Sequence, residues 1–271
     1  MPTASPTSTS PFSALHTHLS RAVLACRTDA VPRAVHTLRT TTRRLEGLLK
    51  KALEDHPRVK EFRKAADKSL HHIKRVRRLA AAVRDLDVHQ KLLKKVLQEP
   101  LSVTTDQDSL HHDHHQLDRF LEQKREQAAG ILSSGLARRE VRLERALERT
   151  AVVLEELPDS PVDPLTTARR WVERSTSSLH ALSAENLHDF RKQTKLARYV
   201  SEMQSPSKAA RAFTRNLLAV QNAIGAWHDL DLLHQEAKAI CGKHSALVMF
   251  LATRTEEALK QALAKARSIP L

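Results

Sequence analysis

The sequence predicts an all-α protein, and three observations indicate this fold class. Only 5 of the 271 residues are glycine, and aromatic residues make up only 3% of the chain. A β-sandwich or β-barrel needs turn glycines and strand aromatics in greater number. The 11 prolines fall almost entirely between segments whose apolar residues recur with the period of a helix. Because proline fits a helix only in its first turn, these prolines separate one predicted helix from the next.

The breaks define eight predicted helices. They span residues 12–29, 32–55, 58–98, 107–157, 164–182, 184–204, 206–240 and 243–267. The fourth is unusually long, so we expect a kink or break at Gly130 or at Ser133-Ser134-Gly135. The proline-rich stretch 157–164 is the best internal boundary, and it divides the chain into a first helical half, 12–157, and a second, 164–267.

The first residues of the chain, the lack of a long apolar stretch and the cysteines predict a cytoplasmic protein. Residues 1–11 are polar and rich in Pro, Ser and Thr, which predicts a disordered leader and not a signal peptide. No stretch approaches the ~20 apolar residues of a membrane span. Cys26 and Cys241 stand alone in apolar helical surroundings, which favours small core residues in a reducing compartment.

The charge of the chain indicates a polyanionic partner. Lys and Arg exceed Asp and Glu by 14, whereas a net charge of about 2–8 normally suffices for solubility. Nucleic acid, an anionic membrane surface and a phosphate polymer all fit this charge. The glycine-rich phosphate loops of dinucleotide-binding and P-loop proteins are absent, so those classes are excluded.

Two motifs recur in the same order and predict a duplicated helical unit. The run H-x-L-R-x-x-x-R-R-L begins at His36, and H-x-F-R-x-x-x-K-x-x-R-Y begins at His188, an offset of 152 residues. The sequence V-R-D-L-D-V around Asp85 corresponds to W-H-D-L-D-L around Asp229, an offset of 144.

Each His motif predicts a basic helix face. At 100° per residue, the histidine and the basic residues three and seven positions later lie within about 60° of one another, opposite the apolar residues. Acidic residues are almost absent from both faces. If the halves pack with pseudo-twofold symmetry, the two faces line one groove, where arginine forks match phosphate oxygens.

These motifs resemble those of the CHAD (conserved histidine α-helical domain) family, and the resemblance spans residues 12–267. It implies two four-helix, bundle-like subdomains related by pseudo-twofold symmetry around a basic central channel that binds inorganic polyphosphate. The domain is not known as a catalyst, and it implies no metal or cofactor. Association with polyphosphate granules is a family-level expectation.

The resemblance assigns polyphosphate contacts to the matching basic positions. These are His36, Arg39, Arg43, Arg44, Arg77, Arg84, His188, Arg191, Lys195, Arg198 and Arg215. The chain departs from the family pattern at Glu46, where a basic residue commonly follows Arg-Arg-Leu, and at His228, where a small polar residue often precedes the aspartate. Glu46 lies at the edge of the basic face and would lower its local charge.

The aspartates of the second motif have two interpretations. Asp85, Asp87, Asp229 and Asp231 would either form a metal or acid–base site, or orient and neutralise neighbouring arginines on packed helices. We favour the second interpretation, because carboxylates among so many cations find arginine partners readily.

Two other functions stay open. The pairs His112-Asp113, His188-Asp189 and His228-Asp229 are compatible with a metal-dependent HD-type phosphohydrolase, although 16 histidines produce such pairs easily. The histidines of the cluster His111–His115 have spacings that suit zinc or nickel, but we interpret any metal binding there as adventitious binding at the surface. Non-specific nucleic-acid binding shares the same electrostatic attraction, but only Tyr199 offers a stacking ring on a basic face.

Overall fold

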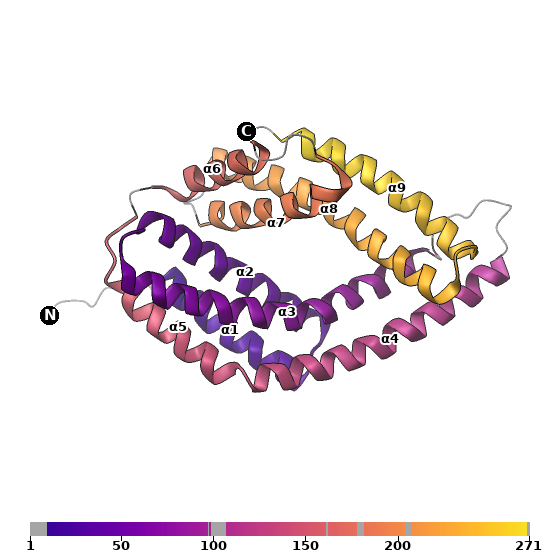
Figure 1. Ribbon diagram of the computed structural model, residues 1–271, viewed down its shortest axis with the longest axis horizontal. Helices are drawn as coiled ribbons and strands as arrows, with labels where there is room; N and C mark the ends of the chain where they lie inside the picture. The colour runs from indigo at the N-terminus through magenta and orange to yellow at the C-terminus, as the bar shows by residue number, and fades with distance from the viewer. Residues whose placement is uncertain are drawn as a thin grey trace. The chain divides into compact units, whose positions relative to one another are not determined.

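A computed structural model describes residues 10–96, 98, 107–160, 162–177, 182–203 and 207–269, and every regular element within these ranges is an α-helix (Figure 1). The predicted all-α class is therefore confirmed. The helices are α1 (Pro11–Thr28), α2 (Pro32–Asp55), α3 (Lys60–Val96), α4 (Gln107–Ala137), α5 (Glu140–Glu155), α6 (Pro164–Ser177), α7 (Ala184–Ser201), α8 (Lys208–Cys241) and α9 (Ala246–Arg267). Most of the predicted leader, residues 1–9, lies outside the described ranges.

Serine caps and prolines define where several helices begin. Ser10 accepts a hydrogen bond from the backbone N–H of Ser13 at 3.2 Å, and Pro11 occupies the first turn of α1. Ser207 and Ser245 cap α8 and α9 in the same way. Gly242 follows the last residue of α8 as its C-cap, and its φ of 85° lies in the region that favours glycine.

The break in the long fourth helix lies later than predicted. Helix α4 continues through Gly130 and Gly135, and the chain turns at Arg138 and Arg139 before α5 begins. Gly135 has a packing role instead: a Cβ there would come 2.7 Å from Cδ1 of Leu79, so its absence lets α3 approach α4. The guanidinium of Arg139 donates to the Gly135 carbonyl at 3.0 Å, which satisfies one of the last carbonyls of α4.

The chain folds into two compact units that differ from the two sequence halves. Unit 1 comprises the described residues of Met1–Ala80 and Ile131–Pro161, and unit 2 those of Ala81–Gly130 and Val162–Leu271. Residues 81–130, which the sequence boundary places in the first half, pack with the second half. The reason is that α3 and α4 continue without a break past the point where one apolar core ends and another begins.

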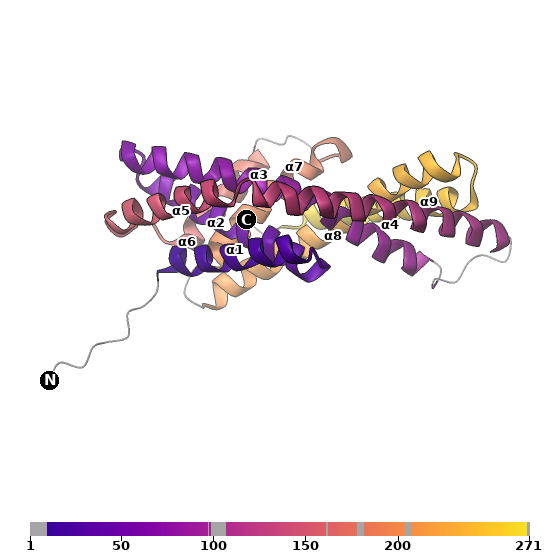
Figure 2. The same cartoon turned by 90° about the horizontal axis from the view of Figure 1, so that it is seen from below.

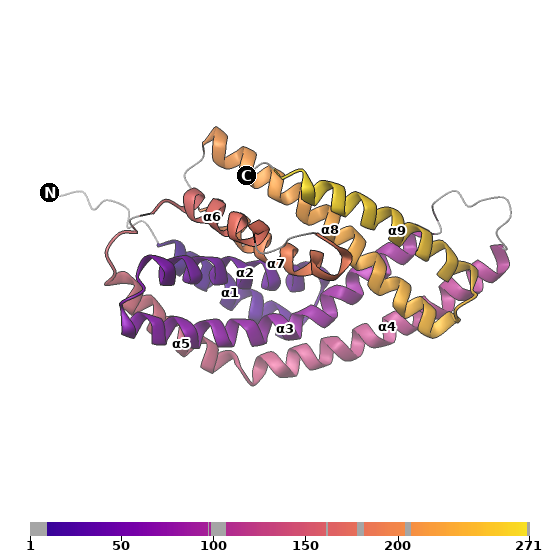
Figure 3. The ribbon, with the colours of Figure 1, turned by 45° about the horizontal axis from the view of Figure 1, so that its top comes forward.

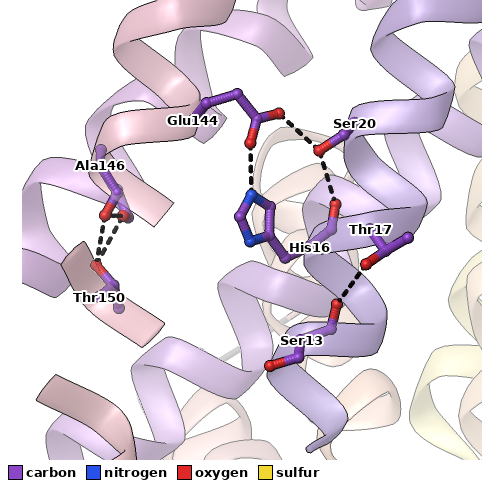
Figure 4. A network of polar contacts seen from close by, with 8 residues as sticks. Ser13, His16, Thr17, Ser20, Glu144, Ala146 and Thr150 are labelled. Carbon is purple, nitrogen blue, oxygen red and sulfur yellow. Dashed lines mark hydrogen bonds and ion pairs between the residues drawn. The ribbon is translucent and has the colours of Figure 1, made fainter. Parts of the chain in front are cut away.

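In unit 1, α1 packs against α2 and α5. A polar clamp joins α1 to α5: Nε2 of His16 lies 2.5 Å from one carboxylate oxygen of Glu144, and the Ser20 hydroxyl donates to the other at 2.6 Å (Figure 4). His16 and Ser20 are one helical turn apart, so a single carboxylate holds both. The clamp fixes which face of α1 is turned toward α5.

Unit 2 has its own cores, and α8 contributes to each of them. Helices α8 and α9 lie side by side, as Figure 2 and Figure 3 show. At one end they bury leucines of α3 and α4, including Leu93 and Leu117. Nearer the site described below, Phe190 of α7 packs with Ile224 of α8, and this contact sets the facing surfaces of α7 and α8.

Two further findings concern the apolar length of the described helices and the state of the cysteines. None of the described helices combines the length and apolar character needed to cross a bilayer. Cys26 is fully buried, Cys241 is partly buried, and both are free thiols. Burial raises the pKa of each thiol to about 11, so both are protonated near neutral pH and act as small core residues.

Candidate functional site

In unit 1, basic residues of α2 and α3 gather around one carboxylate. Arg43 donates from Nη1 to Oε2 of Glu46 at 3.0 Å, and Nζ of Lys50 lies 3.2 Å from Oε1. From α3, Nη1 of Arg77 lies 2.7 Å from the same Oε2, an ion pair without a well-aligned hydrogen bond to any described residue. With Arg39, whose charge also acts on Arg77, these residues form the first basic cluster.

The charges of this cluster depend on one another. The pKa of Arg77 falls to about 10, mainly because burial disfavours its charged form and because Arg43 and Arg39 repel it, while Glu46 partly restores it. Burial also disfavours the Glu46 carboxylate, but Arg77, Lys50 and Arg43 outweigh that effect and hold its pKa below the usual value. Glu46 and Arg77 are therefore both ionised near neutral pH.

Two further predicted contacts lie on the same helix as the first cluster. His36 and Arg44 are both exposed on α2. His36 precedes Arg39 by three residues, which places it one turn nearer the start of α2, on the face that Arg39 and Arg43 share. The basic face predicted from the spacing is thus exposed at His36 and partly buried at Arg39 and Arg43.

In unit 2, the second His motif meets α8. The rings of His188 and His228 have centroids 4.3 Å apart. Arg191 lies over Gly225, where a Cβ would come 2.6 Å from Nη2, and its Nε donates to the backbone carbonyl of Gln221 at 3.4 Å. Glycine thus lets the guanidinium approach the backbone of α8 closely.

Arg198 completes the second basic cluster, which we define as His188, Arg191, Arg198 and His228. Its Nε donates to Oε1 of Gln221 at 2.9 Å, and it also pairs with Glu202. Its guanidinium carbon lies 4.2 Å from the centroid of the Tyr199 ring. These contacts hold the side chain in one orientation.

Both histidines of the cluster are neutral near pH 7 without a ligand. The pKa of His188 falls to about 4, first because of burial and then because His228, Lys192 and Arg191 repel a proton, with Asp189 acting the other way. Nδ1 of His188 is buried and makes no hydrogen bond to the described residues.

The pKa of His228 is lowered for the same two reasons. Burial is the larger cause and repulsion by Arg191 follows, while three carboxylates act in the opposite direction: Asp229, Asp85 and Asp231. Asp85 lies on α3 in the part that belongs to unit 2, so the second motif of the sequence repeat contributes to the charge around His228.

The remaining predicted residues occupy different surroundings. Lys195 is partly buried one turn after Arg191 on α7. Arg84 is partly buried on α3 within unit 2. Arg215 is exposed on α8 and points about 120° around the helix from Gln221, so it does not share the face that holds Arg191 and Arg198.

Two uncharged residues that organise the second cluster were missed by sequence reasoning. Gln221 is buried and contacts both arginines, through its carbonyl and its side chain. Gly225 provides the space for Arg191. A signal for Gly225 existed, because a glycine inside a helix costs stability and usually has a packing reason. No signal in a single sequence distinguishes Gln221 from other helical glutamines.

Two of the His-Asp pairs meet, since the His188 and His228 rings have centroids 4.3 Å apart, but the aspartates and the pairs do not form a metal site among the described residues. The Asp87 carboxylate accepts from Nε of Arg125 at 2.9 Å, which supports the interpretation of arginine neutralisation for Asp87. Asp189 is exposed and pairs with Lys192, away from the buried Asp113 next to Cys241. Within the described ranges, no three His, Cys, Asp or Glu side chains come together as a metal site would require.

The histidines of the cluster at the start of α4 differ in their exposure to solvent. His111, His112 and His115 are exposed, whereas His114 is buried. The pKa of His114 is lowered, chiefly by burial, so its ring is neutral near pH 7. The i, i+3, i+4 spacing thus does not present all its rings to solvent.

The fold and the two clusters define an all-α protein with basic residues concentrated on paired helices. Over residues 12–238 the sequence matches the CHAD domain, so the protein belongs to the CHAD domain family. Two solved structures share the fold. The crystal structure of the CHAD domain from the plant Ricinus communis is 21% identical, with a TM-score of 0.63, covering 96% of this chain and 90% of that chain. PptA from Streptomyces chartreusis is 18% identical, with a TM-score of 0.65, covering 94% and 93%. A comparison with curated proteins found no match.

Proposed function

We propose that this protein binds inorganic polyphosphate, without turning it over, through the two basic clusters. The observation that carries the proposal is that each copy of the repeated His motif lies on a helix whose arginines meet a neighbouring helix: Arg43 shares the Glu46 carboxylate with Arg77 of α3 in unit 1, and Arg191 lies against Gly225 of α8 in unit 2. Membership of the CHAD domain family supports the choice of polyphosphate among polyanions. The shared channel expected from the sequence stays a prediction.

Binding by such clusters is electrostatic and multivalent. Arginine forks donate to two phosphate oxygens at once, and the partly buried surroundings of Arg77 and Arg191 strengthen each contact relative to an exposed one. Individual contacts are weak, but contacts made by one polymer add through effective concentration. In a cell, this activity would place the protein in the cytoplasm, at polyphosphate granules.

The test is isothermal titration with long-chain polyphosphate at about 150 mM salt, where exposed charges more than about 8 Å apart are largely screened. We expect Arg39→Ala/Arg191→Ala to lose roughly 100-fold in affinity, since each charge-assisted contact contributes about 1.5 kcal/mol or more and 1.4 kcal/mol is tenfold. Arg33→Ala/Arg119→Ala, which removes two exposed arginines outside the clusters, should lose far less.

Duplex DNA is the control ligand. A flexible phosphate chain can bring successive phosphates to both guanidinium groups of a cluster, whereas the phosphates of a duplex are held apart by its rigid geometry. Equal affinities for DNA and polyphosphate, or a cluster variant that binds like the control variant, would contradict the proposal and favour general polyanion binding.

A further inference from the structure

The first basic cluster contains one acidic side chain, Glu46, among four cationic side chains. Glu46 is buried on α2, and its two carboxylate oxygens contact cations on both sides: Arg43 and Arg77 at Oε2, and Lys50 at Oε1. The carboxylate is ionised, since the surrounding cations lower its pKa. One negative charge therefore lies in contact with the guanidinium groups that the proposed function assigns to phosphate.

We propose that Glu46 is an internal anion that competes with phosphate for Arg43 and Arg77, an inference that rests on the proposed function. In the unliganded protein, the carboxylate offsets the repulsion that Arg43 and Arg39 exert on the partly buried Arg77. When phosphate binds, the same negative charge repels the ligand. Glu46 thus stabilises the empty site and lowers its affinity, so that only a ligand of high charge density binds well.

The geometry indicates that repulsion outweighs any positioning that Glu46 provides. Arg43 and Arg77 each contact the carboxylate through one nitrogen, Nη1, which leaves other donors of each fork for phosphate. A phosphate on those donors would lie roughly 6–7 Å from the carboxylate, a distance at which charges in a partly buried site still interact appreciably. A glutamine at position 46 keeps an oxygen that accepts from one arginine but removes the charge.

The experiment compares Glu46→Gln with wild type and with Glu61→Gln, which removes the same charge from an exposed position of α3 in unit 1. We expect Glu46→Gln to bind long-chain polyphosphate roughly 3- to 10-fold more tightly and to have a lower Tm without ligand. Glu61→Gln should change affinity much less, and its effect should vanish at about 0.5 M salt, where exposed charges are screened. A purely structural role for Glu46 would lower stability and affinity together.

A second measurement separates this inference from the proposed function. Pyrophosphate should raise the Tm of Glu46→Gln by more than it raises that of wild type, whether or not the protein prefers long polyphosphate to DNA. Loss of that preference in wild type contradicts the proposed function alone. Equal or weaker polyphosphate binding by Glu46→Gln, together with an equal or smaller pyrophosphate shift, overturns the role of Glu46.

Discussion

Arg191 is positioned by two residues of α8 that carry no charge. Gly225 removes the side chain that would occupy its place, and the Gln221 carbonyl accepts from its Nε. In unit 1 a charged residue positions the arginines instead, because the Glu46 carboxylate forms ion pairs with both Arg43 and Arg77. The two clusters therefore hold similar cations by different means, and substitutions in them should have different signatures.

Substitution of Gly225 should impair binding without harming the fold. In Gly225→Ala the new Cβ would meet Nη2 of Arg191, the mobile end of a side chain, so the guanidinium moves and the helix does not. Alanine also improves helix propensity by about 1 kcal/mol. We expect a three- to tenfold loss of polyphosphate affinity, on the order of one weakened charge-assisted contact, with an unchanged or higher Tm.

The matched control is Gly130→Ala, since nothing lies within 4 Å of the position of its Cβ. It should raise stability similarly and leave affinity unchanged. Wild-type affinity in Gly225→Ala would show that the present position of Arg191 is not needed for binding.

Binding should strengthen as pH falls from 7 to about 5.5. His188 is neutral in the free protein, with a pKa of about 4 caused mainly by burial. A bound phosphate raises this pKa, so binding takes up protons in the window between the free and bound pKa values. We expect roughly a three- to tenfold gain in affinity, because up to one proton is coupled to each site.

The control for this prediction is His188→Gln, which cannot titrate. Its affinity for polyphosphate should rise less than that of wild type over the same pH range. Isothermal titration of both proteins in buffers of different ionisation enthalpy measures the affinity and the number of protons taken up. An identical pH profile for the variant and the wild type would assign the titration to other histidines.

At the scale of elements, helix faces are fixed by contacts between segments distant in the chain. Glu144 of α5 contacts both His16 and Ser20 of α1, so it determines the rotation of α1 about its axis (Figure 4). Gly135 of α4 similarly allows close approach by Leu79 of α3. These contacts shape the core of unit 1, and none of them involves a residue of the first basic cluster.

Removal of the α1–α5 clamp should therefore lower stability only. We expect Glu144→Ala to decrease the free energy of unfolding by about 1–2 kcal/mol, because two hydrogen bonds to one partly buried carboxylate are lost. Urea unfolding measures this change, with Glu148→Ala, an exposed position on α5, as the reference. Polyphosphate affinity should be unchanged, and a matching loss of affinity would mean that the clamp also supports the site.

For the whole molecule, the excess of 14 positive charges predicts how affinity depends on the ligand and on salt. Affinity should rise from tripolyphosphate to chains of about 100 phosphates, as further contacts become intramolecular. The logarithm of the affinity should fall linearly with the logarithm of salt concentration, and Arg39→Ala/Arg191→Ala should make that slope shallower by about 2. An affinity independent of chain length would indicate one isolated phosphate site.

Much of the fold and part of the site could be predicted from local patterns. The register of His36 with Arg39 and of His188 with Arg191 follows from the 3.6-residue period, which needs only neighbouring residues. The position of the α4–α5 turn could not be predicted in this way. A glycine in a helical sequence marks either a break in the helix or a site where another helix approaches closely. Gly135 is a site of close approach, because Leu79 of α3 packs against it.

The sequence by itself determined the all-α class, the repeated basic faces and the excess of positive charge, because composition and helical period are local properties of the chain. Only the tertiary structure decided which residues surround those faces. That Arg77 meets Glu46, and that Gln221 and Gly225 receive Arg191, depends on which helices pack together. Such pairings follow from burial of apolar faces contributed by distant segments, and no local pattern records them.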